Sequence, residues 1–143
     1  MQLESAHDIV QAALWFSLLR ACSGVEAFMK KNQGRVSAEQ MVAFLLFEPA
    51  FPRSIAYCLE SAHGLLRRIY PEQSTAPAAH ASLQRLQRLR EWMDAQAKAL
   101  DLLNIHALLT HVVDETAAIC TDVCRAIEGP PRVMTRMRAE LAE

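Results

Sequence analysis

Apolar residues recur along this chain at the spacing of α-helices. Residues 55–69 and 105–127 show the pattern most clearly, because their apolar positions fall three or four residues apart and so share one helix face. The alternation of apolar and polar residues that is typical of β-strands is absent. The pattern predicts an all-α protein, a bundle of about five mostly antiparallel helices with short connections. The two clearest stripes are Ile55, Leu59, Ala62, Leu66 and Ile69, and Ile105, Leu108, Val112, Thr116, Ile119, Val123 and Ile127.

The first predicted helix covers residues 6–32, after a serine N-cap at Ser5. Its apolar residues surround the helix and do not follow one stripe, and a helix that is apolar on all sides must be covered on all sides. Four short neighbouring helices offer little surface for this. We therefore expect an interaction surface for another polypeptide, made by Val10, Leu14, Trp15 and Leu18.

Two prolines mark the boundary between the second and third predicted helices. Ser37 and Gln40 form a capping-box pattern that begins the second helix. Pro49 ends that helix, because a residue before proline is pushed out of the helical region. Pro52 fits the first position of the third helix, where its missing N–H costs nothing. The third helix is expected to stop at Pro71.

The second half of the chain predicts a loop over residues 71–78 and two long helices over 80–100 and 104–128. A chain of 143 residues has the length of one domain. We therefore expect a single helical bundle domain over residues 1–131. Residues 132–143 form a tail, expected as a short helix or a frayed end.

Composition and charge narrow the partners and the compartment. Fifteen basic against sixteen acidic residues give a net charge of −1, which argues against binding to nucleic acid or an anionic membrane. The most apolar stretch, residues 9–19, has about half the length of a membrane span. The four cysteines include no CxxC pair and no signal-peptide pattern is present, so we expect a cytoplasmic protein with mostly buried free thiols.

Candidate chemistry is sparse. Cys120 and Cys124 share a helix face and could bind a metal together with His106 or His111, but thiolate zinc sites favour CxxC pairs, so we expect neither metal nor cofactor. The sequence has no GxSxG nucleophile elbow and no glycine-rich phosphate loop. This favours a non-catalytic protein, although a nucleophile assembled in space from distant residues stays an open alternative.

Arginines gather on the fourth predicted helix. Arg85 and Arg88 add to the expected interaction surface as a basic patch, near Arg67 and Arg68 at the end of the third helix. Such a patch can dock an acidic partner. The alternative is a solvated helix face, which is the commoner role of charge runs on helices.

The turn between the second and third helices is the most specific local feature. Glu48, Arg53 and Ser54 surround Pro49 and Pro52 there. A cation near the positive end of a helix dipole requires a compensating partner, which is a carboxylate, a set of carbonyls or a ligand. Two interpretations follow: Arg53 buttresses the turn, or these three residues line a binding or enzymatic pocket.

These residues carry a family resemblance. The stretch Phe44-Leu45-Leu46-Phe47-Glu48-Pro49-Ala50-Phe51-Pro52-Arg53-Ser54-Ile55, with Cys58-Leu59, resembles the alpha-E domain family, bacterial all-helical proteins named for a conserved Glu-Arg motif. The resemblance covers about residues 9–128. The family's opening segment, which holds the Glu-Arg motif, has no counterpart here, so we expect the C-terminal half of that domain. Further matching positions are Trp15, 19–21, 26–27, 34–36 and 83–86.

The resemblance also implies a genomic setting. Alpha-E domains occur beside, or fused to, circularly permuted ATP-grasp ligase-like domains and transglutaminase-like peptidases. This implies an accessory role in a system that makes or modifies peptide-type amide bonds. The expected partner is then an ATP-grasp-like domain or a second copy of the chain.

Overall fold

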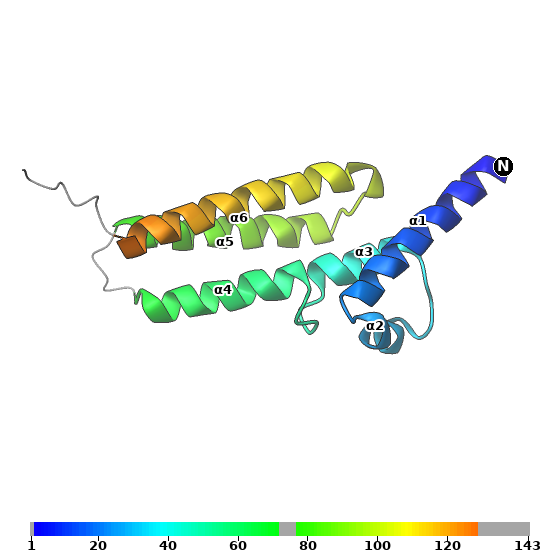
Figure 1. Ribbon diagram of the computed structural model, residues 1–143, viewed down its shortest axis with the longest axis horizontal. Coiled ribbons are helices and arrows are strands. Elements are labelled where there is room, and N and C mark those ends of the chain that lie inside the picture. The colour runs from blue at the N-terminus through cyan, green and yellow to red at the C-terminus, as the bar shows by residue number, and fades with distance from the viewer. Residues whose placement is uncertain (1, 72–76, 129–143) are drawn as a thin grey trace, which may run out of the picture.

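The computed structural model describes residues 2–71 and 77–128, and within them every regular element is helical (Figure 1). The all-α prediction is therefore confirmed. A short 3-10 turn over Leu102–Asn104 leads into the last helix. The six described helices are α1 (Gln2–Ala21), α2 (Val25–Asn32), α3 (Ala38–Phe47), α4 (Ile55–Ile69), α5 (Pro77–Ala97) and α6 (Ile105–Glu128).

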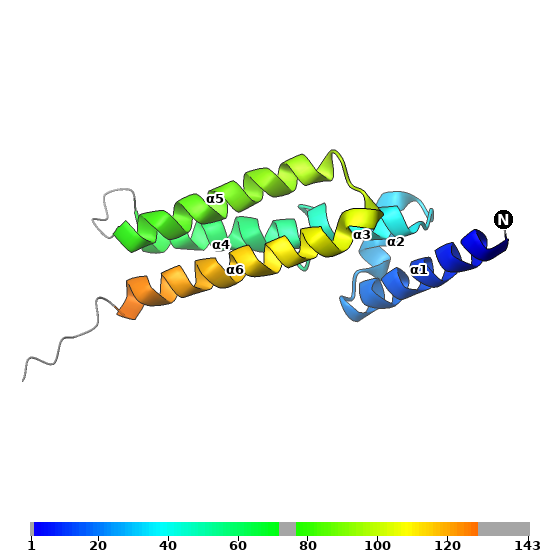
Figure 2. The same cartoon turned by 90° about the horizontal axis from the view of Figure 1, so that it is seen from above.

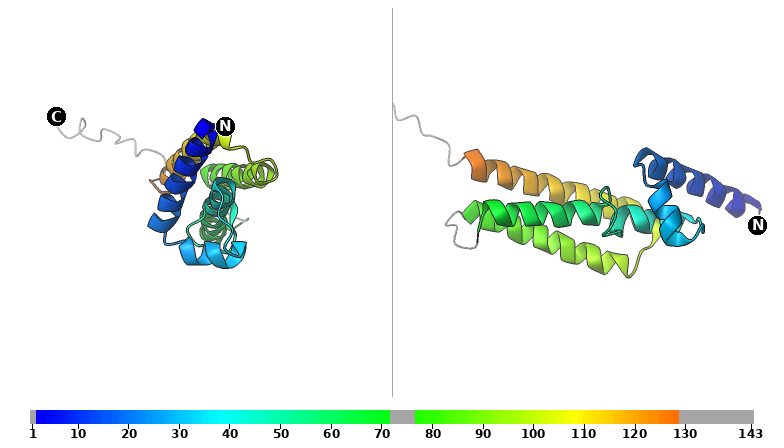
Figure 3. Two further views of the ribbon diagram at one scale, coloured as in Figure 1. Left: turned by 90° about the vertical axis from the view of Figure 1, so that its right-hand side faces the viewer. Right: turned by 90° about the horizontal axis from the view of Figure 1, so that it is seen from below.

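Three long helices form the body of the molecule. α5 runs antiparallel to α4 and to α6 and packs against both (Figures 1 and 2). α3 continues the line of α4 at one end of this body. α1 packs on α3 there, and its N-terminal half projects beyond the bundle in the side views (Figures 1 and 2, and Figure 3, right).

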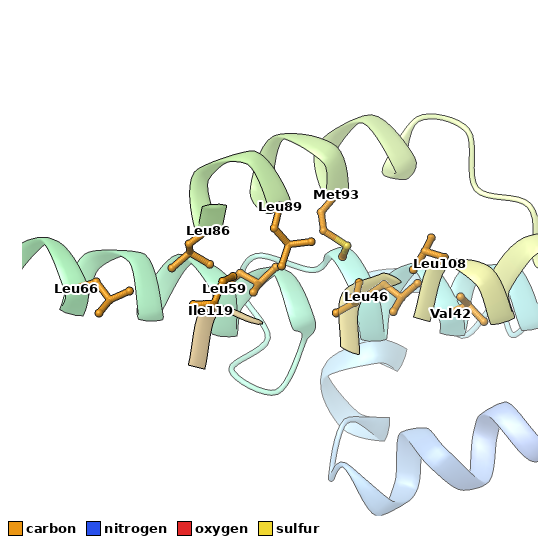
Figure 4. Close-up of a cluster of buried hydrophobic side chains, with 10 residues drawn as sticks. Val42, Leu46, Leu59, Leu66, Leu86, Leu89, Met93, Leu108 and Ile119 are labelled. Atoms are coloured by element: carbon orange, nitrogen blue, oxygen red, sulfur yellow. The ribbon is translucent and has the colours of Figure 1, made fainter. Parts of the chain in front are cut away.

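The main hydrophobic core lies between α3, α4, α5 and α6 (Figure 4). The apolar stripes of the sequence supply it, as the 3.6-residue period requires. Partly buried side chains, Trp15 and Trp92 among them, pack around its edge. Its buried members are Val42, Leu46, Leu59, Leu66, Leu86, Leu89, Met93, Leu108, Val112 and Ile119.

A second core cluster joins α1, α2, α3 and the turn that follows α3. The Phe44 ring lies edge-on to Phe28 at a centroid distance of 5.5 Å and stacks on Phe51 at 4.9 Å. Trp15 of α1 packs against this cluster and the main core. Trp15 thus adds a contact between two cores that α3 also joins, because α3 supplies buried residues to both. The buried members of the second cluster are Leu19, Phe28, Met41, Phe44, Leu45 and Phe51.

The prediction of one continuous helix over residues 6–32 is wrong. The chain breaks after Ala21, and the axes of the two halves differ by 119°. Ser23 takes a left-handed conformation with φ of 55°, which ends α1. A Cβ on Gly24 would lie 2.8 Å from Leu19 Cδ1 and 3.0 Å from Phe51 Cζ, so glycine permits the close approach of α1 to the turn after α3.

Helix boundaries also differ from the prediction at α4. Pro52 lies in the preceding turn and not at the first helical position, because Ser54 is the N-cap and the helix begins at Ile55. The cap of α3 is confirmed: Ser37 Oγ accepts a 3.2 Å hydrogen bond from the backbone N–H of Gln40. The fourth predicted helix begins earlier than expected, at Pro77.

The expected apolar stripes end earlier than the helices that carry them. Ile69 and Ile127 were expected to face inward but are exposed at the last turns of α4 and α6. The prediction of mostly buried thiols is also wrong, because Cys58, Cys120 and Cys124 are exposed and Cys22 is half-buried. The predicted tail and the domain boundary at residue 131 lie outside the described residues.

Candidate functional site

Glu48, Arg53 and Ser54 come together in the α3–α4 turn, residues 48–54, as their spacing predicts. Ser54 is fully buried, and its hydroxyl donates a 2.6 Å hydrogen bond to the Glu48 carbonyl. The same oxygen accepts a 3.1 Å hydrogen bond from the backbone N–H of Tyr57, which caps α4. Ser54 therefore ties the end of α3 to the start of α4.

Glu48 is a buried carboxylate with internal partners. Its Oε1 accepts a 3.2 Å hydrogen bond from the Ala50 N–H, and its Oε2 forms an ion pair with Lys31 of α2. A buried charge requires such partners to offset its lost hydration. The carboxylate also lines a small cavity of about 240 Å³, together with Gln40 and Ala97.

Arg53 points toward α1. Its Nη1 donates a 3.0 Å hydrogen bond to the carbonyl of Cys22, just after the last residue of α1. A guanidinium there satisfies an orphan carbonyl and suits the negative end of the helix dipole. Of the three kinds of partner expected for Arg53, which are a carboxylate, a set of carbonyls or a ligand, the structure shows a backbone carbonyl. The described contacts give the α3–α4 turn a structural role, because each of its three polar side chains holds neighbouring backbone.

The outer face of α1 is exposed and apolar. Ile9, Val10 and Leu14 are 67%, 60% and 67% exposed, and Leu18 is 46% exposed. Val10, Leu14 and Leu18 are four residues apart and lie on one face. Trp15, which was grouped with them from the sequence, instead faces the two cores.

The arginines of α5 divide between three directions. Arg85 faces α6, where its guanidinium lies 3.3 Å from Asp122 and 3.7 Å from Glu115. Arg90 faces α4 and forms an ion pair with Glu60. Arg88 forms no ion pair with any carboxylate of the described residues. Arg85 and Arg88, expected as one patch, therefore belong to different surfaces.

Arg88 lines a cleft between α4 and α5. The cleft has a volume of about 1050 Å³ and is open to solvent. Sequence reasoning missed it, although pairs four residues apart on each helix, His63 with Arg67 and Gln84 with Arg88, gave a signal. The lining residues are His63, Arg67, Tyr70, Pro71, His80, Leu83, Gln84, Gln87, Arg88 and Glu91.

Two further features bear on function. Within residues 2–71 and 77–128, no three histidine, cysteine or acidic side chains lie close enough together to hold a metal ion, and this includes Cys120 and Cys124. In the same residues no single helix has both the length and the apolar character to cross a membrane. The bent pair of 6–21 and 25–32 meets both criteria when its halves are combined.

One surface ion pair, between Glu26 and Lys30, shifts the pKa of both its members. Lys30 and Glu26 lie one turn apart on α2, and the Lys30 ammonium donates a 2.7 Å hydrogen bond to the carboxylate. This hydrogen bond lowers the pKa of Glu26 and raises the pKa of Lys30. Both side chains are solvent-exposed, so the pair belongs to the surface and not to the α3–α4 turn.

Comparison with known proteins gives one match. The model of the Alpha-E family, described as a predicted alpha-helical domain with a conserved ER motif, matches residues 1–127. No curated protein matches the chain. No solved structure matches it either.

Proposed function

The chain belongs to the Alpha-E family, and on this premise we propose that it is a non-catalytic helical interaction module. The observation that carries the proposal is the outer face of α1, where Val10, Leu14 and Leu18 are exposed on a helix that projects from the bundle (Figure 3). An amphipathic helix that lays its apolar face into a groove is a common form of peptide recognition.

Energetics support a protein partner for this face. Burying a leucine or valine side chain contributes about 1.5–3 kcal/mol relative to leaving it exposed. Because Val10, Leu14 and Leu18 are 46–67% exposed, docking gains only part of this amount for each, and further contacts of the interface must help to offset the cost of association. The α3–α4 turn offers less support for a ligand pocket, because Arg53 and Ser54 already hold the ends of α1 and α3.

The family resemblance suggests the partner and the setting. We propose an ATP-grasp-like domain as the partner, with a second copy of this chain as the rival. The chain would then act as an accessory to a bacterial, cytoplasmic system that forms peptide-type amide bonds. This part of the proposal rests on resemblance, while the docking face rests on the exposure of α1.

A pair of charge substitutions tests the docking face. We expect Leu14→Glu to abolish binding to a co-expressed ATP-grasp-type protein, measured by co-elution and by titration of the purified proteins. Leu65→Glu is the matched control, because Leu65 of α4 is also more than half exposed but lies away from α1. Both variants should keep the helical circular dichroism of the original chain, since neither side chain is buried.

Analytical ultracentrifugation of the chain alone decides between the two partners. If the chain self-associates, and Leu14→Glu removes this association while Leu65→Glu does not, a second copy of the chain binds the outer face of α1. A monodisperse monomer that also fails to bind the ATP-grasp-type protein contradicts the proposed function. Equal effects of the two substitutions on binding contradict the assignment of α1 as the interface.

A further inference from the structure

We propose that the α4–α5 cleft binds an acidic polypeptide segment, with Arg88 as the anchoring cation. The site is separate from the outer face of α1 and does not depend on the function proposed above. It lies between the C-terminal half of α4 and the N-terminal half of α5, and its volume of about 1050 Å³ is at the upper end of the usual ligand-site range.

Arg88 differs from the other two arginines of α5 in its ion-pair partners. Arg85 and Arg90 on the same helix are both committed to carboxylates of neighbouring helices. Arg88 is exposed on the cleft wall and has no ion pair with a described carboxylate. Its guanidinium can therefore offer a planar pair of N–H donors to an incoming carboxylate without losing an internal contact.

The walls around Arg88 are rich in hydrogen-bond donors. Arg67, His63 and Tyr70 come from α4, and His80 and Gln84 come from α5. Arg67 and His80 have contacts of their own, so the anchoring role falls to Arg88. This donor set fits a ligand that consists mainly of acceptors, which is the character of an acidic peptide with its carbonyls and carboxylates.

Among the described residues that line the cleft, Glu91 is the single carboxylate, and it does not cancel this character. Its Oε1 accepts a 2.8 Å hydrogen bond from Gln87 Nε2, and Gln87 Oε1 in turn accepts a 3.0 Å hydrogen bond from Arg90. Glu91 is thus held along α5 by its neighbours. Neutralising it should strengthen binding of an acidic ligand, because a like charge at the cleft wall is removed.

The shape of the cleft favours an extended ligand over an enclosed small molecule. The cleft is open to solvent, so it cannot surround a ligand. Leu83 and Pro71 give apolar surface beside the donors, which suits the side chains and the backbone of a peptide. We therefore choose an acidic polypeptide over a free phosphate as the occupant.

Fluorescence anisotropy of the full chain with a fluorescein-labelled octa-glutamate peptide tests the proposal. We expect saturable binding that Arg88→Gln weakens by about tenfold, which corresponds to about 1.4 kcal/mol. Arg125→Gln is the matched control, because it removes the same charge from an exposed position on α6 outside the cleft. It should change the dissociation constant by less than about twofold, as expected for a distant screened charge.

Four further measurements keep the result specific. A labelled octa-glutamine peptide should not bind, and Glu91→Gln should tighten octa-glutamate binding. In the nuclear magnetic resonance spectrum, the side-chain amides of Gln84 and Gln87 should shift on titration with octa-glutamate. Circular dichroism should show unchanged helix content for each variant, because Arg88, Arg125 and Glu91 are exposed.

Several outcomes would overturn the proposal. Absence of octa-glutamate binding at moderate salt, or equal weakening by Arg88→Gln and Arg125→Gln, shows that the cleft is not an acidic-peptide site. Inorganic pyrophosphate is the competing probe, added at constant ionic strength. If pyrophosphate binds in an Arg88-dependent manner and octa-glutamate does not, the cleft is a phosphate site and the peptide assignment is wrong.

Discussion

At the scale of single residues, Gly24 and Ser54 hold the junction between the α1–α2 break and the α3–α4 turn. Gly24 leaves space for Leu19 and Phe51 to approach the backbone. Ser54 uses one buried hydroxyl for two hydrogen bonds to backbone on either side of the turn. Both residues are small. Adding a methyl group at Gly24, or removing the hydroxyl of Ser54, would disrupt these contacts.

Gly24→Ala should destabilise the fold, while Gly64→Ala should stabilise it. The new methyl group at position 24 would meet Leu19 Cδ1 at 2.8 Å, and overpacking of this kind costs about 1–3 kcal/mol. A methyl group at Gly64, within α4, meets no atom within 4 Å, and alanine is favoured over glycine in a helix by about 1 kcal/mol. Urea unfolding measures the free energy of unfolding of both variants. If both substitutions change it in the same direction, the packing explanation is wrong.

Ser54→Ala should lower the free energy of unfolding by about 1–3 kcal/mol. The variant loses the cap of α4, worth about 0.5–2 kcal/mol, and leaves the Glu48 carbonyl without its hydroxyl donor. Ser61→Ala is the control, because Ser61 is exposed in the middle of α4 and should change stability by less than about 0.5 kcal/mol. If Ser54→Ala lowers the free energy of unfolding no more than Ser61→Ala does, the cap contributes little to stability.

At the scale of helices, the ends of α1, α3 and α4 are joined by polar side chains, while α4, α5 and α6 are joined by apolar stripes and ion pairs. Arg53 connects the start of α4 to the end of α1 across 31 positions in the sequence. Arg85 connects α5 to two acidic residues of α6. Exposed pairs of this kind are individually weak, so their main effect is on how the helices are positioned.

Arg53→Ala should loosen the end of α1 without unfolding the bundle. Hydrogen exchange of the backbone amides in the last turn of α1 should accelerate, because the Cys22 carbonyl loses its donor and the helix end frays. Arg53→Lys should restore part of the protection, while the exposed Arg35→Ala should leave α1 unchanged. If Arg53→Ala removes binding of a ligand with no change in exchange, the pocket interpretation of this turn is correct.

At the scale of the whole molecule, Trp15 adds a contact from α1 between two hydrophobic clusters that already share the helix α3. It packs from α1 against the main core and against the cluster around Phe44. Shared packing of this kind makes two clusters unfold together. The projecting end of α1 is thus anchored through its inner face, which leaves its outer face available.

Trp15→Ala should split or broaden the thermal unfolding transition. The second cluster then keeps only the shared helix α3 as its link to the main core, so its α1 and α2 part unfolds at a lower temperature. Trp92→Ala is the control, because Trp92 packs against the main core and against His111 at a centroid distance of 4.3 Å. It should lower the midpoint of a single transition. Differential scanning calorimetry that shows one sharp transition for both variants would contradict the coupling by Trp15.

The sequence by itself determined the helical class, the approximate bounds of α3 to α6 and the gathering of Glu48, Arg53 and Ser54 in one turn, but not the break between α1 and α2. These depend on local signals, such as the apolar period of α4 and α6, the Ser37 cap and the two prolines. Local signals can be read along the chain because they involve residues within about one helical turn of each other.

Tertiary structure decided what those residues contact. The break at Gly24 depends on Phe51, the partner of Arg53 is a carbonyl 31 residues away, and Arg85 and Arg88 separate because α6 and α4 lie on different sides of α5. Such contacts join positions far apart in sequence, and their geometry follows from how whole helices pack. Local patterns place His63 with Arg67 and Gln84 with Arg88 on single helix faces, but only the packing of α4 against α5 brings these two faces together as a cleft.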